Sequence, residues 1–353
     1  MNEGRAEQTD VSLPSWKEVL STPPPRVVPP EPAEPAQPAQ PEVRDRLLVH
    51  LVWEVLLGMA AAGLVLANLA QESADYLTSM FGSAAPLGLI AVGLSLSLRT
   101  AAPNLAVGMV ASVTAALAVH LNQDGWGSGV AIAVGLGAAL GAGLLLGLLA
   151  MLLSAPAWAL SLGFVFALGA AYGVLAGDGA DPGTPLGGFS AMGAFVAFAV
   201  LSAAGGAVWL IPGVRRALSG LRREGEPGRW AGLRTGLGAL AGLAGSTLLA
   251  GGAGILEAME AGSPPPDDAM LVTVSALGAV LIGGVSVFGR RGGIFGTLFG
   301  VVIIVSALDL FARNGVVEWL EPVFLGGMVV VGLLVTRAIE GLNALFDRDR
   351  TPD

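Results

Sequence analysis

Long apolar segments separated by short polar stretches follow one another from residue 47 to the end of the chain. A helix needs about 20 apolar residues to cross the hydrocarbon core of a bilayer, and most of these segments reach or approach that length. The pattern predicts an all-α polytopic membrane protein with about ten transmembrane helices. The expected spans are 47–70, 84–99, 103–121, 129–153, 157–176, 188–211, 231–256, 269–288, 293–312 and 319–341.

The second and third segments are short, and only Arg99-Thr-Ala-Ala-Pro103 separates them. A proline interrupts the hydrogen-bond pattern of a helix, and non-helical backbone at membrane depth occurs where it is buried in protein or lines a cavity. We therefore expect a broken or re-entrant element here.

The first 45 residues have a different composition. Pro23 to Glu42 is rich in proline with Pro-Ala-Gln repetition, which favours a disordered, partly polyproline II segment. Val11 to Leu20 is either a short amphipathic docking peptide or part of an inert tail. The predicted organisation is a disordered cytoplasmic segment (1–45), a transmembrane domain (46–345) and a short cytoplasmic tail (346–353).

Charge is scarce and unevenly distributed. Charged residues make up 13% of the chain, about half the ~25% of soluble domains. With the N-terminus in the cytoplasm, ten spans leave only Arg313 outside, and acidic residues gather in the outer loops. Cytoplasmic loops of membrane proteins carry an excess of Lys and Arg, so this distribution predicts an even number of spans, with both termini on the cytoplasmic side of the cell membrane.

The chain offers little material for catalysis. It has no cysteine, its two histidines (His50 and His120) lie far apart, and its one lysine, Lys17, is in the N-terminal segment. A P-loop needs a lysine after its glycine-rich turn. We expect no enzymatic activity, no metal site and no cofactor on this chain, and any ATP must be bound by a partner subunit.

Two polar residues inside or beside the apolar segments are candidates for a substrate pathway. Glu54 lies about two turns into the first span, although it could instead reach the nearby interface. Asn104 follows Pro103 at the expected break, where its alternative role is a helix cap.

Glycines at four-residue spacing favour close helix packing. Gly292, Gly296 and Gly300 give one helix a smooth side, and similar pairs occur at 137/141 and 143/147.

Arginines gather in two predicted cytoplasmic segments. The loop from Pro212 to Arg229 is either a surface helix that docks on a partner or an ordinary positively charged loop; it carries Arg215, Arg216, Arg222 and Arg223. Arg290 and Arg291 form the turn within Leu281–Gly300. An arginine at mid-membrane costs roughly 2.5–3.5 kcal/mol on insertion scales, so this turn is expected at a membrane face.

The stretch LIGGVSVFGRRGGIFGTLFGVVIIVSALDLF, with the final span after it, resembles the C-terminal part of ABC-importer permeases of the ribose and simple-sugar branch, which is related to branched-chain amino-acid and nucleoside permeases. Upstream, Ala101-Ala-Pro-Asn-Leu-Ala-Val-Gly108 is similar to the family's Gly-Gly-Ile-Asp-Leu-Ser-Val-Gly motif, with alanines for both glycines and asparagine for aspartate. The family's coupling segment leaves only a trace, in Val214–Gly220.

The resemblance implies the membrane-spanning subunit of an importer for a small polar solute, with a simple sugar as the first candidate. It also implies a homo- or heterodimer of permease subunits, cytoplasmic ATP-binding subunits and an extracytoplasmic solute-binding protein. The arginines at 215, 216, 222, 223, 290 and 291 would then face the ATPase. Two alternatives remain: a permease-derived scaffold or regulatory protein without transport, and an ATP-independent ten-helix transporter. We expect no nucleic-acid partner.

Overall fold

The structure is a computed structural model, and it describes residues 47–71, 75–176, 186–211, 213–214, 233–261, 268–287, 293–317 and 319–348. All of these belong to one unit, Arg44–Asp353. The predictions for residues 1–45, for the arginines at 215, 216, 222 and 223, and for Arg290, Arg291 and Gly292 lie outside the described residues.

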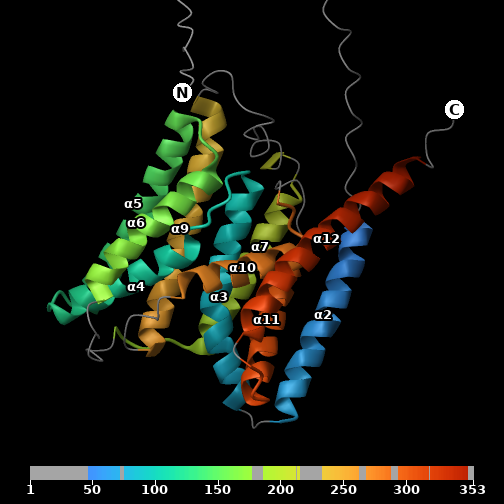
Figure 1. Cartoon of the computed structure of the whole chain (residues 1–353), viewed down its shortest axis with the longest axis horizontal. Helices are drawn as coiled ribbons and strands as arrows, with labels where there is room; N and C mark the ends of the chain where they lie inside the picture. The colour runs from blue at the N-terminus through green and yellow to red at the C-terminus, as the bar shows by residue number, and fades with distance from the viewer. Residues whose placement is uncertain are drawn as a thin grey trace, which may run out of the picture. The chain divides into compact units, whose positions relative to one another are not determined.

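The described residues form ten α-helices and no strand (Figure 1). Eight are long and apolar enough to cross a membrane, whereas α4 and α10 are shorter. The predicted all-α polytopic class is therefore confirmed. The helices are α2 (Leu47–Leu69), α3 (Asp75–Arg99), α4 (Val107–Gln123), α5 (Ser128–Leu153), α6 (Ala157–Ala176), α7 (Ala191–Trp209), α9 (Leu233–Ala261), α10 (Ala269–Ile282), α11 (Gly296–Arg313) and α12 (Leu320–Arg348).

Helix α3 is longer than the sequence predicts. It has 25 residues and contains Pro86, so the expected short span at 84–99 is wrong. Its first turns are buried, with Tyr76 and Met80 at 1% and 3% exposure. These turns therefore pack through one face, while the polar residues Thr78, Ser79 and Ser83 lie on the exposed side.

Helix α10 is shorter than predicted. The expected span at 269–288 ends at Ile282, after 14 residues. The N–H of Val285 donates to the carbonyl of Val280, and the N–H of Gly284 donates to that of Leu281. Gly284 has a φ of 82°, so the helix ends in a Schellman motif with glycine in the left-handed position. The backbone turns away here although the side chains stay apolar.

The predicted break between α3 and α4 is present, and it has the same geometry. The N–H of Ala102 donates to the carbonyl of Ser97, and that of Ala101 donates to Leu98. The left-handed residue is Ala101, with a φ of 56°. An alanine therefore occupies a position where glycine is usual.

Replacing Ala101 with glycine should stabilise the protein, because the left-handed conformation costs an L-residue roughly 1–2 kcal/mol. Glycine loses more backbone entropy on folding, so we expect a net gain of about 0.5–1 kcal/mol. Thermal unfolding in one detergent measures it. The same replacement at Ala102, outside the left-handed position, is the control, and an equal gain there would contradict the account.

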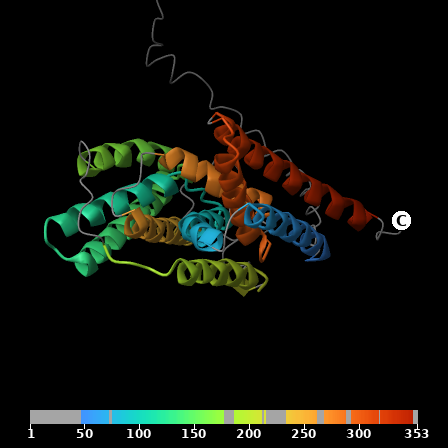
Figure 2. The same cartoon turned by 90° about the horizontal axis from the view of Figure 1, so that it is seen from below.

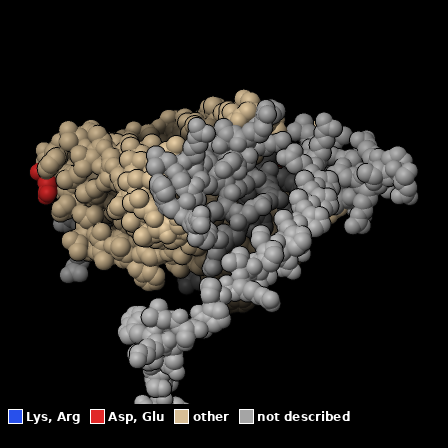
Figure 3. Space-filling view, turned by 90° about the horizontal axis from the view of Figure 1, so that it is seen from above, with Lys and Arg blue, Asp and Glu red and all other residues tan. Residues whose placement is uncertain are grey.

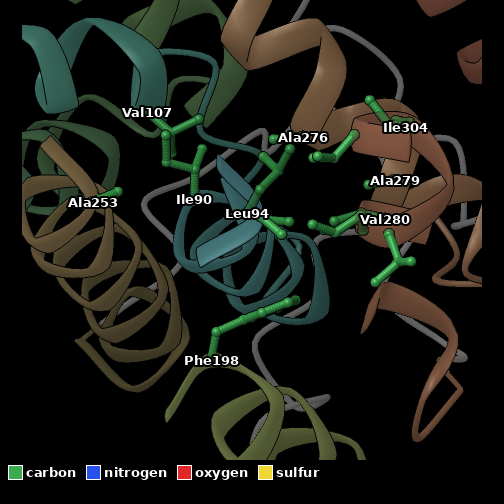
Figure 4. Packing of buried hydrophobic residues seen from close by; sticks show 14 of the residues in the cluster. Ile90, Leu94, Val107, Phe198, Ala253, Ala276, Ala279, Val280 and Ile304 are labelled. Atoms are coloured by element: carbon green, nitrogen blue, oxygen red, sulfur yellow. The ribbon is translucent and has the colours of Figure 1, made fainter. Parts of the chain in front are cut away.

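Helix α3 lies at the centre of the packing. Ile90 and Leu94 of α3 are fully buried, and they face residues from α4, α7, α9, α10 and α11 (Figure 4). Helix α7 packs chiefly on α3 and lies along the edge of the bundle in Figure 2. The labelled core residues are Ile90, Leu94, Val107, Phe198, Ala253, Ala276, Ala279, Val280 and Ile304.

Glycines let helix backbones touch at several crossings. A Cβ at Gly296 would overlap the carbonyl oxygen of Gly283, and one at Gly300 would overlap that of Ala279. Gly143 and Gly147 face α9 in the same way. In contrast, Gly137 and Gly141 have no atom within 4 Å of such a Cβ, so that pair marks an outward face of α5.

Apolar side chains also cover much of the outside. Leu144 and Leu148 of α5 and Phe166 and Val174 of α6 are between 40% and 82% exposed. The described residues that Figure 3 shows are almost all uncharged, with an acidic patch at one edge. Such a surface suits contact with lipid.

Candidate functional site

The break between α3 and α4 centres on Asn104, which is fully buried. Its Nδ2 donates to Ser246 Oγ of α9 at 2.7 Å, and its Oδ1 accepts from the N–H of Ala106 at 3.0 Å. Its own N–H donates to Ser97 Oγ of α3 at 3.3 Å. Both ends of the amide and the backbone donor therefore have partners.

Hydroxyl groups from two further helices complete this polar network. The N–H of Leu105 donates to Ser161 Oγ of α6 at 3.0 Å, and the N–H of Gly108 donates to Thr273 Oγ1 of α10 at 3.2 Å. Unpaired backbone groups are costly in a membrane interior, so non-helical backbone there requires such acceptors. Side chains of α3, α6 and α10 thus accept hydrogen bonds from the backbone N–H groups around the interruption before α4. A side chain of α9 accepts from the Asn104 amide.

The helix-cap alternative for Asn104 is wrong, because the N-cap of α4 is Ala106 and makes no side-chain capping hydrogen bond; Asn104 instead stabilises the turn just before the helix. Its amide oxygen accepts from the backbone two residues later, which is an Asx turn. Its place in a substrate pathway stays a prediction.

Replacing Asn104 with alanine should lower the free energy of unfolding by about 1–3 kcal/mol, because the buried N–H of Ala106 would lose its acceptor. Thermal unfolding in detergent measures the loss. Asn314→Ala is the control, since that exposed amide bonds only the carbonyl one turn earlier. If both variants unfold like the wild type, the network does not stabilise the break.

The second predicted pathway residue, Glu54, lies on α2 and is 6% exposed. Its Oε1 accepts from the N–H groups of Phe295 at 2.9 Å and Gly296 at 3.2 Å. A carboxylate at a helix N-terminus satisfies free N–H groups and interacts favourably with the helix dipole. Glu54 therefore holds the start of α11, where a Cβ at Gly293 would overlap its carboxylate. Its role in a pathway also stays a prediction.

The same end of the bundle contains a residue that the sequence marked only as a charge near a membrane face. Arg99, at the end of α3, is 6% exposed. Its Nη1 donates to the carbonyl of Gly205 at 2.8 Å, and its Nη2 donates to that of Gly293 at 3.3 Å. The guanidinium also lies 5.5 Å from the ring centroid of Trp209. It thus joins α3, α7 and the start of α11.

Trp53 extends this cluster to α10. Its Nε1 donates to the carbonyl of Ile282, the last residue of α10, at 2.8 Å. The starts of α2 and α11 therefore meet the ends of α3, α7 and α10. Within the described residues, no group of three or more His, Cys, Asp or Glu could hold a metal ion.

These observations define a class: a multi-pass α-helical membrane protein, closely packed through glycines, in which polar side chains stabilise an interrupted helix. Comparison of the sequence with curated proteins adds one similarity. The chain is 35% identical over 89 residues to "Probable ABC transporter permease protein YphD" of Escherichia coli (strain K12).

That similarity is local. It covers 25% of this chain, and the chain spans about a quarter (27%) of the length of the relative. No family model matches the sequence, and no solved structure matches it either. The comparison supports at most the broad group of ABC transporter permeases, and leaves the sugar branch as a proposal.

Proposed function

We propose that this chain is the membrane-spanning permease subunit of an ABC importer for a small polar solute. The observation that carries the proposal is the similarity to an ABC transporter permease, together with the motif in Leu281–Gly300. Two short helices, α4 and α10, beside glycine contacts and a buried polar network are compatible with a pathway whose walls can move.

We also propose that both termini are cytoplasmic. This orientation follows from the arginine distribution along the sequence. In this orientation the starts of α2 and α11 lie at one end of the bundle. The C-terminal ends of α3, α7 and α10 lie at the same end. The contacts of Trp53, Glu54 and Arg99 bring these five helix ends together, which supports the alternation of the spans, while the arginine distribution assigns this end to the cytoplasm.

The partners follow from this function. Two permease subunits, identical or paralogous, would form the pathway, a solute-binding protein would deliver the cargo outside, and ATP-binding subunits would bind inside. The chain has a single lysine, Lys17, and no P-loop, which supports a separate ATPase. A simple sugar is the first cargo to test.

Reconstitution in lipid nanodiscs tests the proposal. The full chain is co-expressed with ATP-binding and solute-binding subunits encoded near its gene, and ATP hydrolysis is measured with and without pentoses and hexoses. We expect hydrolysis to rise with the correct sugar and loaded binding protein. Failure of any ATPase to co-purify, with capture of another protein by the N-terminal segment, would support the scaffold. Solute uptake without an ATPase would support the ATP-independent transporter.

A further inference from the structure

Arg99 connects two parts of the chain that lie far apart in the sequence. Gly205, whose carbonyl it binds, is in the last turns of α7, which ends at Trp209. Gly293, whose carbonyl it also binds, directly follows residues 288–292. The loop after α7 carries the arginines from Arg215 to Arg229, and the segment before Gly293 carries Arg290 and Arg291. One guanidinium therefore bonds a carbonyl in the last turns of α7 and the carbonyl of Gly293, just before α11.

We propose that Arg99 is a positioning residue that links the end of α7 and the start of α11 to the interruption between α3 and α4. This inference rests on the proposed function, in which the link would transmit movement at the ATPase-facing side into the membrane. Arg99 would act through the backbone that it holds, without touching solute or nucleotide.

Close backbone contact makes the two bonded segments one unit. A Cβ at Gly206 would lie 2.5 Å from the Cα of Ile294, so α7 and the start of α11 touch directly beside the guanidinium. Glu54 accepts from the N–H groups of Phe295 and Gly296, at the start of α11. At this start, Arg99 thus donates to the carbonyl of Gly293, and Glu54 accepts from those two N–H groups.

On its other side, Arg99 belongs to the motif that ends α3. Ser97 and Leu98 supply the carbonyls of that motif, and Ala101 is its left-handed residue. Asn104 follows, and its amide reaches α9. Arg99 is therefore only a few residues from the break. A displacement of its guanidinium would shift the backbone at Ala101 and, through it, the hydrogen bonds of Asn104.

The cost of placing arginine here argues against a packing role alone. Burying a charged side chain costs free energy unless the charge is paired, and the hydrogen-bond partners of Arg99 among the described residues are neutral carbonyls. Its buried Nε has no partner. An apolar side chain would fill the same space without that cost. A planar fork of donors, however, can bridge two carbonyls at once, which a lysine ammonium reproduces poorly.

A distance measurement tests the link without reference to transport. The chain has no cysteine, so spin labels can be placed at Ile211→Cys, just after the end of α7, and at Phe295→Cys, just before α11, which are both exposed positions. In the full chain in nanodiscs, we expect a narrow distance distribution that broadens in both Arg99→Gln and Arg99→Lys. Arg313→Gln is the matched control, since that arginine lies over the Tyr76 ring at the far end of α11.

Solute-stimulated ATP hydrolysis in the reconstituted complex provides the second measurement. Arg99→Gln and Arg99→Lys should still assemble with the ATP-binding subunits but lose stimulation by roughly 2- to 30-fold, the range seen for residues that carry coupling between sites. If Arg99→Gln does not fold, Arg99→Lys supplies the test.

The outcomes separate the two proposals. An unchanged distance distribution in both variants overturns the link, whatever the complex does. The link would also be overturned if Arg99→Lys kept both the wild-type distance distribution and the wild-type stimulation of ATP hydrolysis. A positive charge alone would then be sufficient at this position. A broadened distribution with no stimulation of the wild type by any solute overturns the proposed function and, with it, the coupling role of Arg99.

Discussion

Replacing Gly296 with alanine should destabilise the bundle by at least about 1–3 kcal/mol, the usual cost of an added methyl group in a packed core. The new Cβ would overlap the carbonyl oxygen of Gly283 and approach its Cα to 2.9 Å. These are backbone atoms, so no side chain can turn away to make room. The start of α11 would have to move from the end of α10.

Gly137→Ala is the matched control for this prediction. Gly137 lies within α5, and a Cβ there has nothing within 4 Å. Alanine in a helix interior is favoured over glycine by roughly 0.5–1 kcal/mol, so the control should unfold at the wild-type temperature or above it. Thermal unfolding of both variants in the same detergent measures the difference. Equal stability of Gly296→Ala and the wild type would show that α10 and α11 do not meet as closely as described.

The sequence predicts helix positions well where apolar runs are long. Whether an apolar run crosses a bilayer as a helix depends mainly on its length and composition, and both can be read directly from the sequence. Each of the ten predicted segments overlaps one of the ten helices of the described residues, although the ends of several helices differ from the prediction. The break before Asn104 was also predictable, because a proline follows two alanines there.

Helix ends inside apolar sequence were harder to predict. Helix α10 stops at Ile282 through backbone geometry at Gly284, while the sequence remains apolar to Phe288. Helix α3 begins at Asp75, and Tyr76 and Met80 in its first turns are buried while Thr78 and Ser79 are exposed. Hydropathy cannot distinguish these cases, since it records the side chains and neither the φ angles nor the neighbours.

The polar sites were predictable only in part. Glu54 stood out because a carboxylate inside an apolar run needs a partner, but the partners are backbone N–H groups of Phe295 and Gly296. Arg99 was placed at a membrane face and its role was missed. Its partners are carbonyls of two glycines, 106 and 194 residues away, and carbonyls carry no signature in the sequence.

Glu54→Ala should lower the free energy of unfolding by about 1.5–3 kcal/mol, because hydrogen bonds to charged groups have about this strength and the N–H groups of Phe295 and Gly296 would lose their acceptor. The start of α11 should then exchange its amide hydrogens faster. Thermal unfolding and hydrogen exchange of residues 293–300 measure the two effects.

Two variants make the result specific to the carboxylate of Glu54. Glu54→Gln keeps an acceptor oxygen without the charge, so its loss should be smaller than that of the alanine variant. Glu321→Ala removes a carboxylate from the first turn of α12, where the expected effect is below about 1 kcal/mol. If Glu54→Ala matches Glu321→Ala in stability and leaves exchange in α11 unchanged, the carboxylate does not hold that helix. A buried acid without a structural role would then strengthen the prediction that Glu54 belongs to the substrate pathway, because ionisable groups inside a membrane are retained at such positions chiefly for function.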